Sequence, residues 1–226
     1  MKLSPETVTI IKNFAGINQN IWINEGYVLS TVTASRTTVA YATVSEAFDK
    51  SFGIYDLGKF LGVLSLFTDP EITFDESFMK IGEGKNVVKF VYAEQEALIV
   101  PPNKKLNFVD PDITVEVTQD NIARMLKAAD VLGATHISLH GDGKKVDLVA
   151  HSVDTNTGEA VDNSDEYRIT IGKSTAKYRM DLKRENIKML PGDYKMEVVS
   201  TKRISKFTHE TLSLEYYMAC ESTSQK

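Results

Sequence analysis

Three of the four histidines lie near one predicted hairpin, and imidazole nitrogens are common zinc ligands. His136 and His140 fall on one face of a strand because side chains alternate along it, and His151 lies on the next strand. Pairing across the glycine turn would place Lys145 opposite His140 and Val149 opposite His136. No cysteine or acidic residue completes a ligand set. We therefore interpret the three as exposed or partly satisfied strand histidines, and we expect no metal and no cofactor.

Other patterns that could carry catalysis are also incomplete. Cys220 has no neighbouring histidine to activate it as a nucleophile, and it lies near an end that we expect to fray. The pairs Gly82/Gly84 and Gly141/Gly143 precede strands and not helices. They are therefore typical of hairpin turns and not of phosphate-binding loops. No pair of carboxylates stands apart from the solvated acids, so the sequence predicts that the protein is not an enzyme.

Basic side chains on the polar faces of four predicted helices are more informative. They are Lys12, Lys59, Arg124, Lys127, Lys183, Arg184 and Lys188. Most acids on the same helices lie near helix N-termini, where the helix dipole favours them, and the positive charges lie further along. Any single one of these side chains is more often just solvated. Together, four such helices on one layer would present a mildly positive face suited to phosphate contact without base reading.

These basic residues occur in a chain that is acidic overall. Its 226 residues carry a formal net charge of −5, and 42% of them are hydrophobic. A role in nucleic-acid binding would therefore require the positive charge to be segregated onto one surface. The sequence lacks a long apolar run and an apolar leader near Met1, and it has one cysteine. We expect an intracellular protein of a reducing cytosol, with no membrane partner.

Capping residues and hydrophobic periodicity predict the elements that position these side chains. We expect helices between Ser4 and Gly16, Asp56 and Phe67, Thr118 and Gly133, and Asp181 and Leu190. Each begins at a residue type that caps helix N-termini. We expect strands over 20–23, 27–34, 38–44, 51–54, 71–74, 78–81, 86–92, 113–117, 134–140, 145–152, 166–171, 177–180, 194–200 and 211–219. The first two of these strands are predicted to pair as a hairpin.

The same order of elements occurs twice along the chain. Gly16 and Gly133 end the first helix of each half, and Asp56 and Asp181 open the second. The second half has an extra polar loop, 154–164, to which we assign no partner. Helices this far apart in sequence must pack on one face of largely antiparallel sheets. The sequence therefore predicts an α+β fold with two similar domains, each with two short helices. We expect the domains over 1–108 and 109–226, with an extended connector from about residue 93.

Four stretches of the chain resemble the DNA polymerase sliding clamps of T-even-type bacteriophages. They are MKLSPETVTIIKNFAGIN, IYDLGKFLGVLSL, VPPNKKLNF and MLPGDYK, and the similarity runs nearly end to end. The resemblance implies a head-to-tail homotrimer closed into a ring, with helices lining the hole and sheets outside. It implies that duplex DNA passes through the ring without sequence reading and that the ring tethers the replicative DNA polymerase. It also implies loading by a clamp-loader ATPase and a role in late transcription through a sigma-type factor.

The resemblance further implies where partners bind. The seven basic residues would line the ring interior. An apolar partner tail would enter a pocket near the connector, for which the candidates are Leu98, Ile99, Val100, Phe108, Tyr216 and Tyr217. The alternative is that these six are ordinary core residues. Ring closure would use edge strands from 86–92 and 166–180. The alternative function is a non-enzymatic phage structural or protein-interaction β-protein, whose basic helix faces would bind other protein surfaces.

Overall fold

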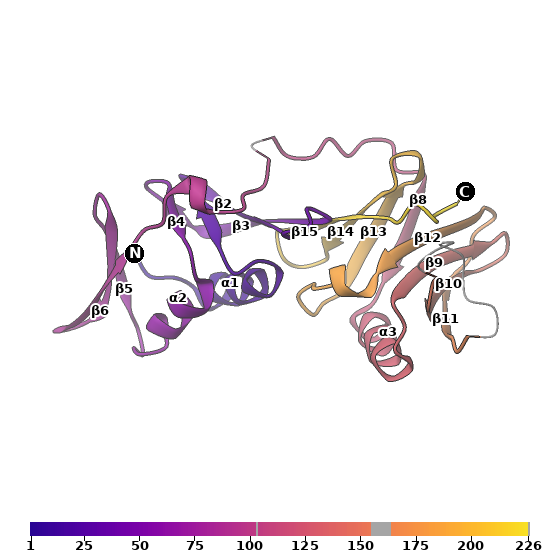
Figure 1. The fold of residues 1–226 in the computed structure, drawn as a ribbon, viewed down its shortest axis with the longest axis horizontal. Helices are drawn as coiled ribbons and strands as arrows, with labels where there is room; N and C mark the ends of the chain where they lie inside the picture. Colours follow the sequence, from indigo (N-terminus) through magenta and orange to yellow (C-terminus); the bar gives the residue numbers. More distant parts are fainter. Residues whose placement is uncertain (103, 155–163, 226) are drawn as a thin grey trace. The chain divides into compact units, whose positions relative to one another are not determined.

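A computed structural model describes residues 1–102, 104–154 and 164–225 (Figure 1). The chain forms two compact units, Met1–Lys105 and Leu106–Lys226. Within each unit the strands pair antiparallel, and the described residues include three α-helices in all. None of the helices in these ranges has the length and apolar character needed to cross a membrane. The units are described separately below.

Unit 1 consists of two helices and seven strands in its described residues. In chain order they are α1 (Pro5–Ile17), β1 (Ile21–Ile23), β2 (Gly26–Val32), β3 (Thr38–Phe48), β4 (Phe52–Ile54), α2 (Leu57–Leu64), β5 (Glu71–Phe74), β6 (Phe78–Glu83) and β7 (Asn86–Val91), followed by a 3₁₀ turn, η1 (Gln95–Ala97). Strand β2 pairs with β3, and β5, β6 and β7 form a three-stranded sheet in that order. Helix α1 packs on α2 and on β2 and β3. Helices α1 and α2 lie next to each other in Figure 1.

The predicted helix starts of unit 1 are confirmed. The Ser4 hydroxyl accepts a hydrogen bond from the Thr7 amide at 3.2 Å, and the Asp56 carboxylate accepts one from the Lys59 amide at 2.9 Å. Both bonds satisfy amides that the first helical turn leaves without partners. The predicted end of α1 at Gly16 is wrong. The helix continues to Ile17, which is buried, and so packing carries it past the glycine.

The predicted hairpin between residues 20–23 and 27–34 is also wrong. Strand β1 pairs with β4, with Ile21 opposite Ile54 and Ile23 opposite Phe52. The side chains of all four residues are buried, so this long-range pairing completes the apolar core of the unit. The short turn between the two runs favoured a local hairpin, but burial of β1 against β4 decided the pairing.

Unit 2 contains one α-helix and eight strands in its described residues. They are β8 (Ile113–Val117), α3 (Gln119–Leu132), β9 (His136–Asp142), β10 (Val146–His151), β11 (Tyr167–Gly172), β12 (Lys177–Lys183), β13 (Tyr194–Val199), β14 (Ile204–His209) and β15 (Leu214–Ala219), with two 3₁₀ turns, η2 (Arg184–Asn186) and η3 (Ser200–Lys202). One sheet has the order β11-β10-β9-β12, and β8, β13, β14 and β15 pair in the order β15-β14-β13-β8. Helix α3 packs on β9, β10 and β11.

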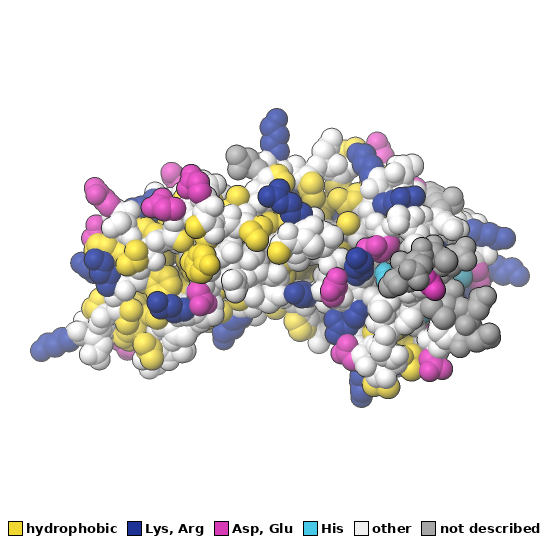
Figure 2. Space-filling model, in the orientation of Figure 1, with side chains coloured by type: hydrophobic (Ala, Val, Ile, Leu, Met, Phe, Trp, Pro, Cys, Tyr) yellow, Lys and Arg dark blue, Asp and Glu magenta, His cyan; other side chains and the backbone are white. Residues whose placement is uncertain are grey.

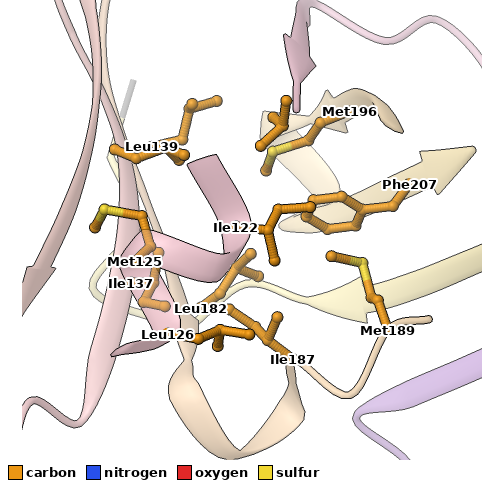
Figure 3. Close-up of a pocket in the computed structure, with 12 residues that line it drawn as sticks. Ile122, Met125, Leu126, Ile137, Leu139, Leu182, Ile187, Met189, Met196 and Phe207 are labelled. Atoms are coloured by element: carbon orange, nitrogen blue, oxygen red, sulfur yellow. The ribbon is translucent and has the colours of Figure 1, made fainter. Parts of the chain in front are cut away.

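The core of unit 2 lies between α3 and these two sets of strands. Ile122, Met125 and Leu126 of α3 line a cavity together with Met196 and Phe207 of β13 and β14, and Ile122 points toward the Phe207 ring (Figure 3). The remaining cavity has a volume of only about 30 Å³ and is lined entirely by apolar side chains. A cavity of this size and lining is a packing void and not a ligand site, because water or a polar ligand would find no partner there.

The predicted fourth helix between Asp181 and Leu190 does not form. Strand β12 continues to Lys183, and only the 3₁₀ turn η2 follows it. Tyr178, Met180 and Leu182 are buried on one face of the strand, which is the two-residue period of a strand and not the period of a helix. Asp181 lies within this strand, fully buried, and caps no helix. The second unit therefore departs from the predicted plan of two helices per half.

Strand β14 was not predicted. Its buried face carries Ser205, Phe207 and His209, and two of these three residues are polar. The alternation of apolar and polar residues that marks a half-buried strand is therefore weak in the sequence. Helix α3, in contrast, matches its prediction. Thr118 caps it in a capping box with Asn121, and Gly133 ends it in the left-handed region at φ 64°.

Candidate nucleic-acid interface

Each α-helix presents one lysine with no acidic partner in the described part of the chain. These are Lys12 on α1, Lys59 on α2 and Lys127 on α3, and all three are exposed. Each of these helices also has buried residues that pack inward, including Phe14 in α1, Phe60 in α2 and Met125 in α3. The Lys59 ammonium lies 5.9 Å from the centre of the Phe90 ring, a cation–π contact that leaves its charge available. Flexible ammonium groups of this kind suit phosphate contact.

Both arginines of the predicted set are paired with acidic side chains. The Arg124 guanidinium lies 2.8 Å from the Asp120 carboxylate one turn earlier in α3. Arg184 binds Asp130 of α3 through two nitrogens, each 3.1 Å from a carboxylate oxygen. This bidentate pair fastens the 3₁₀ turn η2 to α3, so Arg184 has a structural partner that a phosphate would have to displace.

The last two predicted residues do not lie on a helix, because the fourth helix is absent. Lys183 is the final residue of β12, and its ammonium lies 3.8 Å from Glu221. Lys188 is exposed in the irregular segment after η2. Basic and acidic side chains are interspersed over the face that Figure 2 shows, so positive charge is not gathered there into one continuous patch. The basic residues on the helices would therefore attract the phosphates of a nucleic acid only weakly.

The six predicted pocket residues fall into two groups. Leu98, Tyr216 and Tyr217 are buried, and the Tyr216 hydroxyl accepts a hydrogen bond from the Leu190 amide at 3.0 Å. Ile99 is 36% exposed, and Val100 and Phe108 are half-buried. Phe108 packs edge-to-face on Tyr217 at 5.9 Å between ring centres. Burial leaves Tyr216 and Tyr217 little surface to offer a partner, so they serve the core of unit 2.

A groove in unit 1 offers more accessible apolar surface. Its volume is about 850 Å³. Tyr27 and Val28 of β2 line it and are 54% and 46% exposed. The connector contributes Val100, and the other lining residues are Trp22, Asn24, Glu25, Gly26, Ser30, Tyr41, Ser51, Gln95, Pro101, Pro102 and Lys105. Of the six predicted residues, only Val100 lines this groove. The sequence does not predict Tyr27 and Val28 as groove residues, because in the sequence they are typical of an ordinary strand.

The histidine hairpin is offset by two residues from the predicted pairing. His140 lies opposite Asp147, and His136 lies opposite His151, with 6.2 Å between the last two ring centres. Burial dominates at His136 and lowers its pKa. No group of three histidine, cysteine or acidic side chains in the described residues has the geometry to hold a metal ion.

A buried serine, histidine and aspartate meet on the same sheet. The Ser138 hydroxyl lies 2.5 Å from His151 Nε2 and donates a hydrogen bond to Asp181 at 2.6 Å. A serine nucleophile needs a histidine between the serine and the acid, whereas here the serine lies between the other two. All three residues are at most 5% exposed, so no substrate reaches them. The cluster is a structural network and not an active site.

Cys220 is equally unsuited to catalysis. The residue is 7% exposed, and its amide donates a hydrogen bond to the Arg203 carbonyl at 2.8 Å. Burial raises the pKa of its thiol to about 12, so almost no reactive thiolate forms at neutral pH. The expectation that this end of the chain is frayed is wrong at Cys220, because β15 and the residues after it are packed.

Comparison with known proteins identifies the family. Residues 3–100 match the family model of the DNA polymerase processivity factor, and residues 114–222 match that of the gp45 sliding clamp, C terminal. The chain belongs to the sliding-clamp family. Two relatives named sliding clamp are each 29% identical to it: that of Vibrio phage KVP40, over 98% of this chain and 100% of that protein, and that of Enterobacteria phage T4, over 99% and 98%.

Solved structures show the same fold at low sequence identity. A structure titled as the C-terminal region of FEN-1 bound to A. fulgidus PCNA has a TM-score of 0.68 at 12% identity, covering 95% of this chain and 94% of that chain. The Helicobacter pylori beta clamp bound to a DNA ligase peptide has a TM-score of 0.71 at 13% identity, covering 98% and 65%. The family models and the phage relatives, and not these distant structures, identify this sliding clamp as a non-enzymatic processivity factor for DNA polymerase. Clamps of this fold bind DNA and polymerase and form oligomeric rings.

Proposed function

We propose that three copies of this sliding clamp join head to tail into a closed ring around duplex DNA, placed there by a clamp-loader ATPase. Each copy contributes two domains, over residues 1–108 and 109–226. The observation that carries the DNA contact is the set of three lysines, one on each α-helix, that have no acidic partner among the described residues: Lys12, Lys59 and Lys127. Lys188 is also exposed, but the proposal does not rest on it, and Arg124, Lys183 and Arg184 are already paired with acids.

A ring that is held on DNA by its closed topology requires only weak phosphate contacts. Isolated ammonium groups give such contacts, because exposed charges are screened over about 8–10 Å at physiological salt. The net charge of −5 disfavours DNA binding by the rest of the surface. Few cations facing the duplex and excess negative charge elsewhere therefore favour sliding over tight, static binding.

The test replaces Lys12, Lys59 and Lys127 together by Ala. A matched control replaces three exposed lysines away from the α-helices, Lys85, Lys173 and Lys202, by Ala. Both variants change the formal net charge from −5 to −8, so only the position of the removed charge differs. The measurement is retention on nicked circular DNA after loading by the clamp loader of the same phage, as a function of salt.

We expect the helix variant to load several-fold less well than the control at 0.15 M salt. Its dependence on salt should also be shallower, by up to about 0.9 in the logarithmic slope for each phosphate that a lysine no longer neutralises. If both variants load equally well and with the same salt slope, the three helix lysines do not contact DNA. A wild-type chain that stays monomeric at high concentration in light scattering would contradict the ring itself.

Ring closure is proposed to use the outer edges of β7 and β11. No strand pairs with either edge in the described part of the chain. Val87 and Val91 of β7 are 56% and 64% exposed, whereas Phe90 of the same strand is buried. An antiparallel pairing of β7 in one copy with β11 in the next would satisfy both rows of backbone groups and cover these valines.

We further propose that the groove of unit 1 takes an apolar tail of the replicative polymerase and, in turn, of the clamp loader and of a late-transcription sigma-type factor. Exposed Tyr27 and Val28 supply the apolar contact, and Lys105, with its ammonium 5.6 Å from the Tyr41 ring centre, supplies charge at the rim. Partners that share one groove would have to bind one after another.

The groove is tested by Val28→Asp, with Val109→Asp as the matched control because both valines are 46% exposed. Val28→Asp should shorten polymerase run length at least tenfold and reduce late transcription in parallel, since a buried carboxylate opposes apolar docking. The control should leave both activities near wild type. Unchanged run length for Val28→Asp would exclude the groove as the polymerase site.

A further inference from the structure

The two sheets that carry the proposed ring edges each have a second edge, and both second edges are covered by residues from the ends of the chain. An uncovered edge strand presents unpaired amides and carbonyls that pair readily with another chain. The sheet β5-β6-β7 has β5 as its second edge, and the sheet β11-β10-β9-β12 has β12. What covers β5 and β12 therefore decides which edges of these two sheets remain available to another copy.

Met1 covers the edge of β5. The Met1 nitrogen donates to the Ile72 carbonyl at 2.8 Å, and the Ile72 amide donates to the Met1 carbonyl at 2.7 Å. This reciprocal pair is the hydrogen-bond pattern of an antiparallel ladder. Lys2 forms an ion pair with Asp69 just before β5, and its ammonium also lies 3.9 Å from Glu71. The label N lies beside β5 in Figure 1.

Residues 221–225 cover the edge of β12. The amides of Arg179 and Gln225 each donate to the other residue's carbonyl at 2.7 Å. Two residues further along β12, the Glu221 amide donates to the Asp181 carbonyl at 2.9 Å, and the Asp181 amide donates to the Ser224 hydroxyl at 2.9 Å. The backbone amides and carbonyls of Arg179 and Asp181, which point away from β9, are thus all hydrogen-bonded to this segment.

The cover on β12 is anchored by a buried charge. The Asp181 carboxylate is fully buried and accepts hydrogen bonds from Ser138 at 2.6 Å, Arg179 at 3.1 Å and Thr223 at 2.5 Å. A buried carboxylate is tolerated only when donors surround it, so the loss of the Thr223 donor carries a penalty. Asp181 therefore holds residues 221–225 on the strand more firmly than a single backbone bridge would.

We propose that these two segments, Met1–Lys2 and 221–225, are edge caps that direct assembly. By covering β5 and β12, they leave β7 and β11 as the open edges of the two sheets in the described part of the chain. Of the four edges of these two sheets, β7 and β11 are then the ones at which copies join, one edge from each unit, which gives head-to-tail contacts that a ring can close. An uncapped β12 would offer β7 of another copy a second, incorrect site. This inference rests on the proposed pairing of β7 with β11.

The experiment removes the cap on β12 in the full chain and measures assembly size. Gln225→Pro deletes one ladder amide, and Gln225→Ala is its matched control because it keeps that amide. Deletion of residues 224–226 removes the cap more completely. Light scattering and native mass spectrometry over a hundredfold range of concentration give the size distribution, and amide exchange at Arg179 and Asp181 shows whether the edge has opened.

We expect the wild type and Gln225→Ala to form one uniform ring. Gln225→Pro should show faster exchange at Arg179 and a fraction of heavier species that grows with concentration, and the deletion should show more of both. Uniform rings from the deletion variant would overturn the inference while leaving the ring proposal intact. Loss of far-UV circular dichroism on deletion would also overturn it, because the deleted segment would then be needed for the fold itself and not only for covering an edge. A wild type that forms no ring fails the proposed function instead.

Discussion

Asp147 on β10 holds the proposed ring edge in place through charge. Its carboxylate is 2% exposed, and it accepts hydrogen bonds from Thr170 at 2.7 Å and Arg168 at 3.1 Å, both on β11. The Lys145 ammonium lies 2.9 Å from the same carboxylate. Replacement of Asp147 by Asn keeps the shape of the side chain and removes the charge that these three donors share.

The size of the effect follows from the pKa of Asp147. Burial alone would raise this pKa, but the hydrogen bonds from Lys145, Thr170 and Arg168 outweigh it and lower the pKa from 3.8 to about 2. A lowered folded-state pKa stabilises the protein above the unfolded value. The change in the pKa of Asp147 from 3.8 to about 2 corresponds to about 2 kcal/mol of unfolding free energy at pH 7. This contribution is lost as the pH falls from about 4 through about 2, and about half remains near pH 3.

The assay is urea denaturation of the wild type and Asp147→Asn at pH 7, 5, 4 and 3, followed by circular dichroism. The variant should be less stable by about 2 kcal/mol at pH 7 and pH 5, and the difference should narrow to about 1 kcal/mol at pH 3. Asp165→Asn serves as the control because Asp165 is exposed, and it should differ from the wild type by less than about 0.5 kcal/mol.

A difference that is the same at every pH would refute the electrostatic reasoning, because it would mean that Asp147 acts through packing or neutral hydrogen bonds alone. The same variant also bears on assembly. Loosening of β11 should raise the concentration at which rings dissociate, whereas Asp165→Asn should not change it. If Asp147→Asn loses stability but keeps wild-type ring affinity, β11 is not the closing edge.

Further predictions concern local geometry. Gly192→Ala should destabilise unit 2 by about 1–3 kcal/mol, because the new Cβ would clash with Nε2 of His209. Gly62→Ala in α2 should instead stabilise by about 0.5–1 kcal/mol, since nothing lies within 4 Å of the new methyl group; urea titration measures both. Thr118→Ala removes the cap of α3 and should cost about 1 kcal/mol in the same titration. Alkylation of Cys220 by iodoacetamide at pH 8 should be at least about a thousandfold slower in the folded protein than in urea, as followed by mass spectrometry.

The local elements of unit 1 and the first half of unit 2 follow from the sequence because short-range rules determine them. Ser4, Asp56 and Thr118 cap helices as predicted, because a side-chain oxygen three residues before an amide needs no tertiary help to bind it. Gly133 ends α3 for a similarly local reason, its positive φ of 64°. The absence of a catalytic constellation was also predicted from residue types, and membership of the sliding-clamp family supports it.

The partners of each strand could not be derived from the same rules. An aspartate before apolar residues predicts a helix cap, and at Asp56 it forms one. At Asp181 the same pattern lies in a buried strand. The carboxylate there accepts hydrogen bonds from Arg179 of the same strand and from Ser138 and Thr223, which are more than 40 residues away in the sequence. The histidine pairing was offset by two residues for the same reason, since the register follows burial of the whole sheet and not the turn alone.

The amino-acid sequence by itself determined which residue types were present: an acidic chain, seven basic residues on predicted helices and no set of catalytic partners. Tertiary structure decided which of those charges are available. Among the described residues, Lys12, Lys59 and Lys127 have no acidic partner, whereas Arg184 forms an ion pair with Asp130. These two residues are 54 positions apart, so their pairing depends on how strands and helices pack. It also decided which sheet edges are covered, since the hydrogen bonds between Gln225 and Arg179 form only after β12 has taken its place in the sheet.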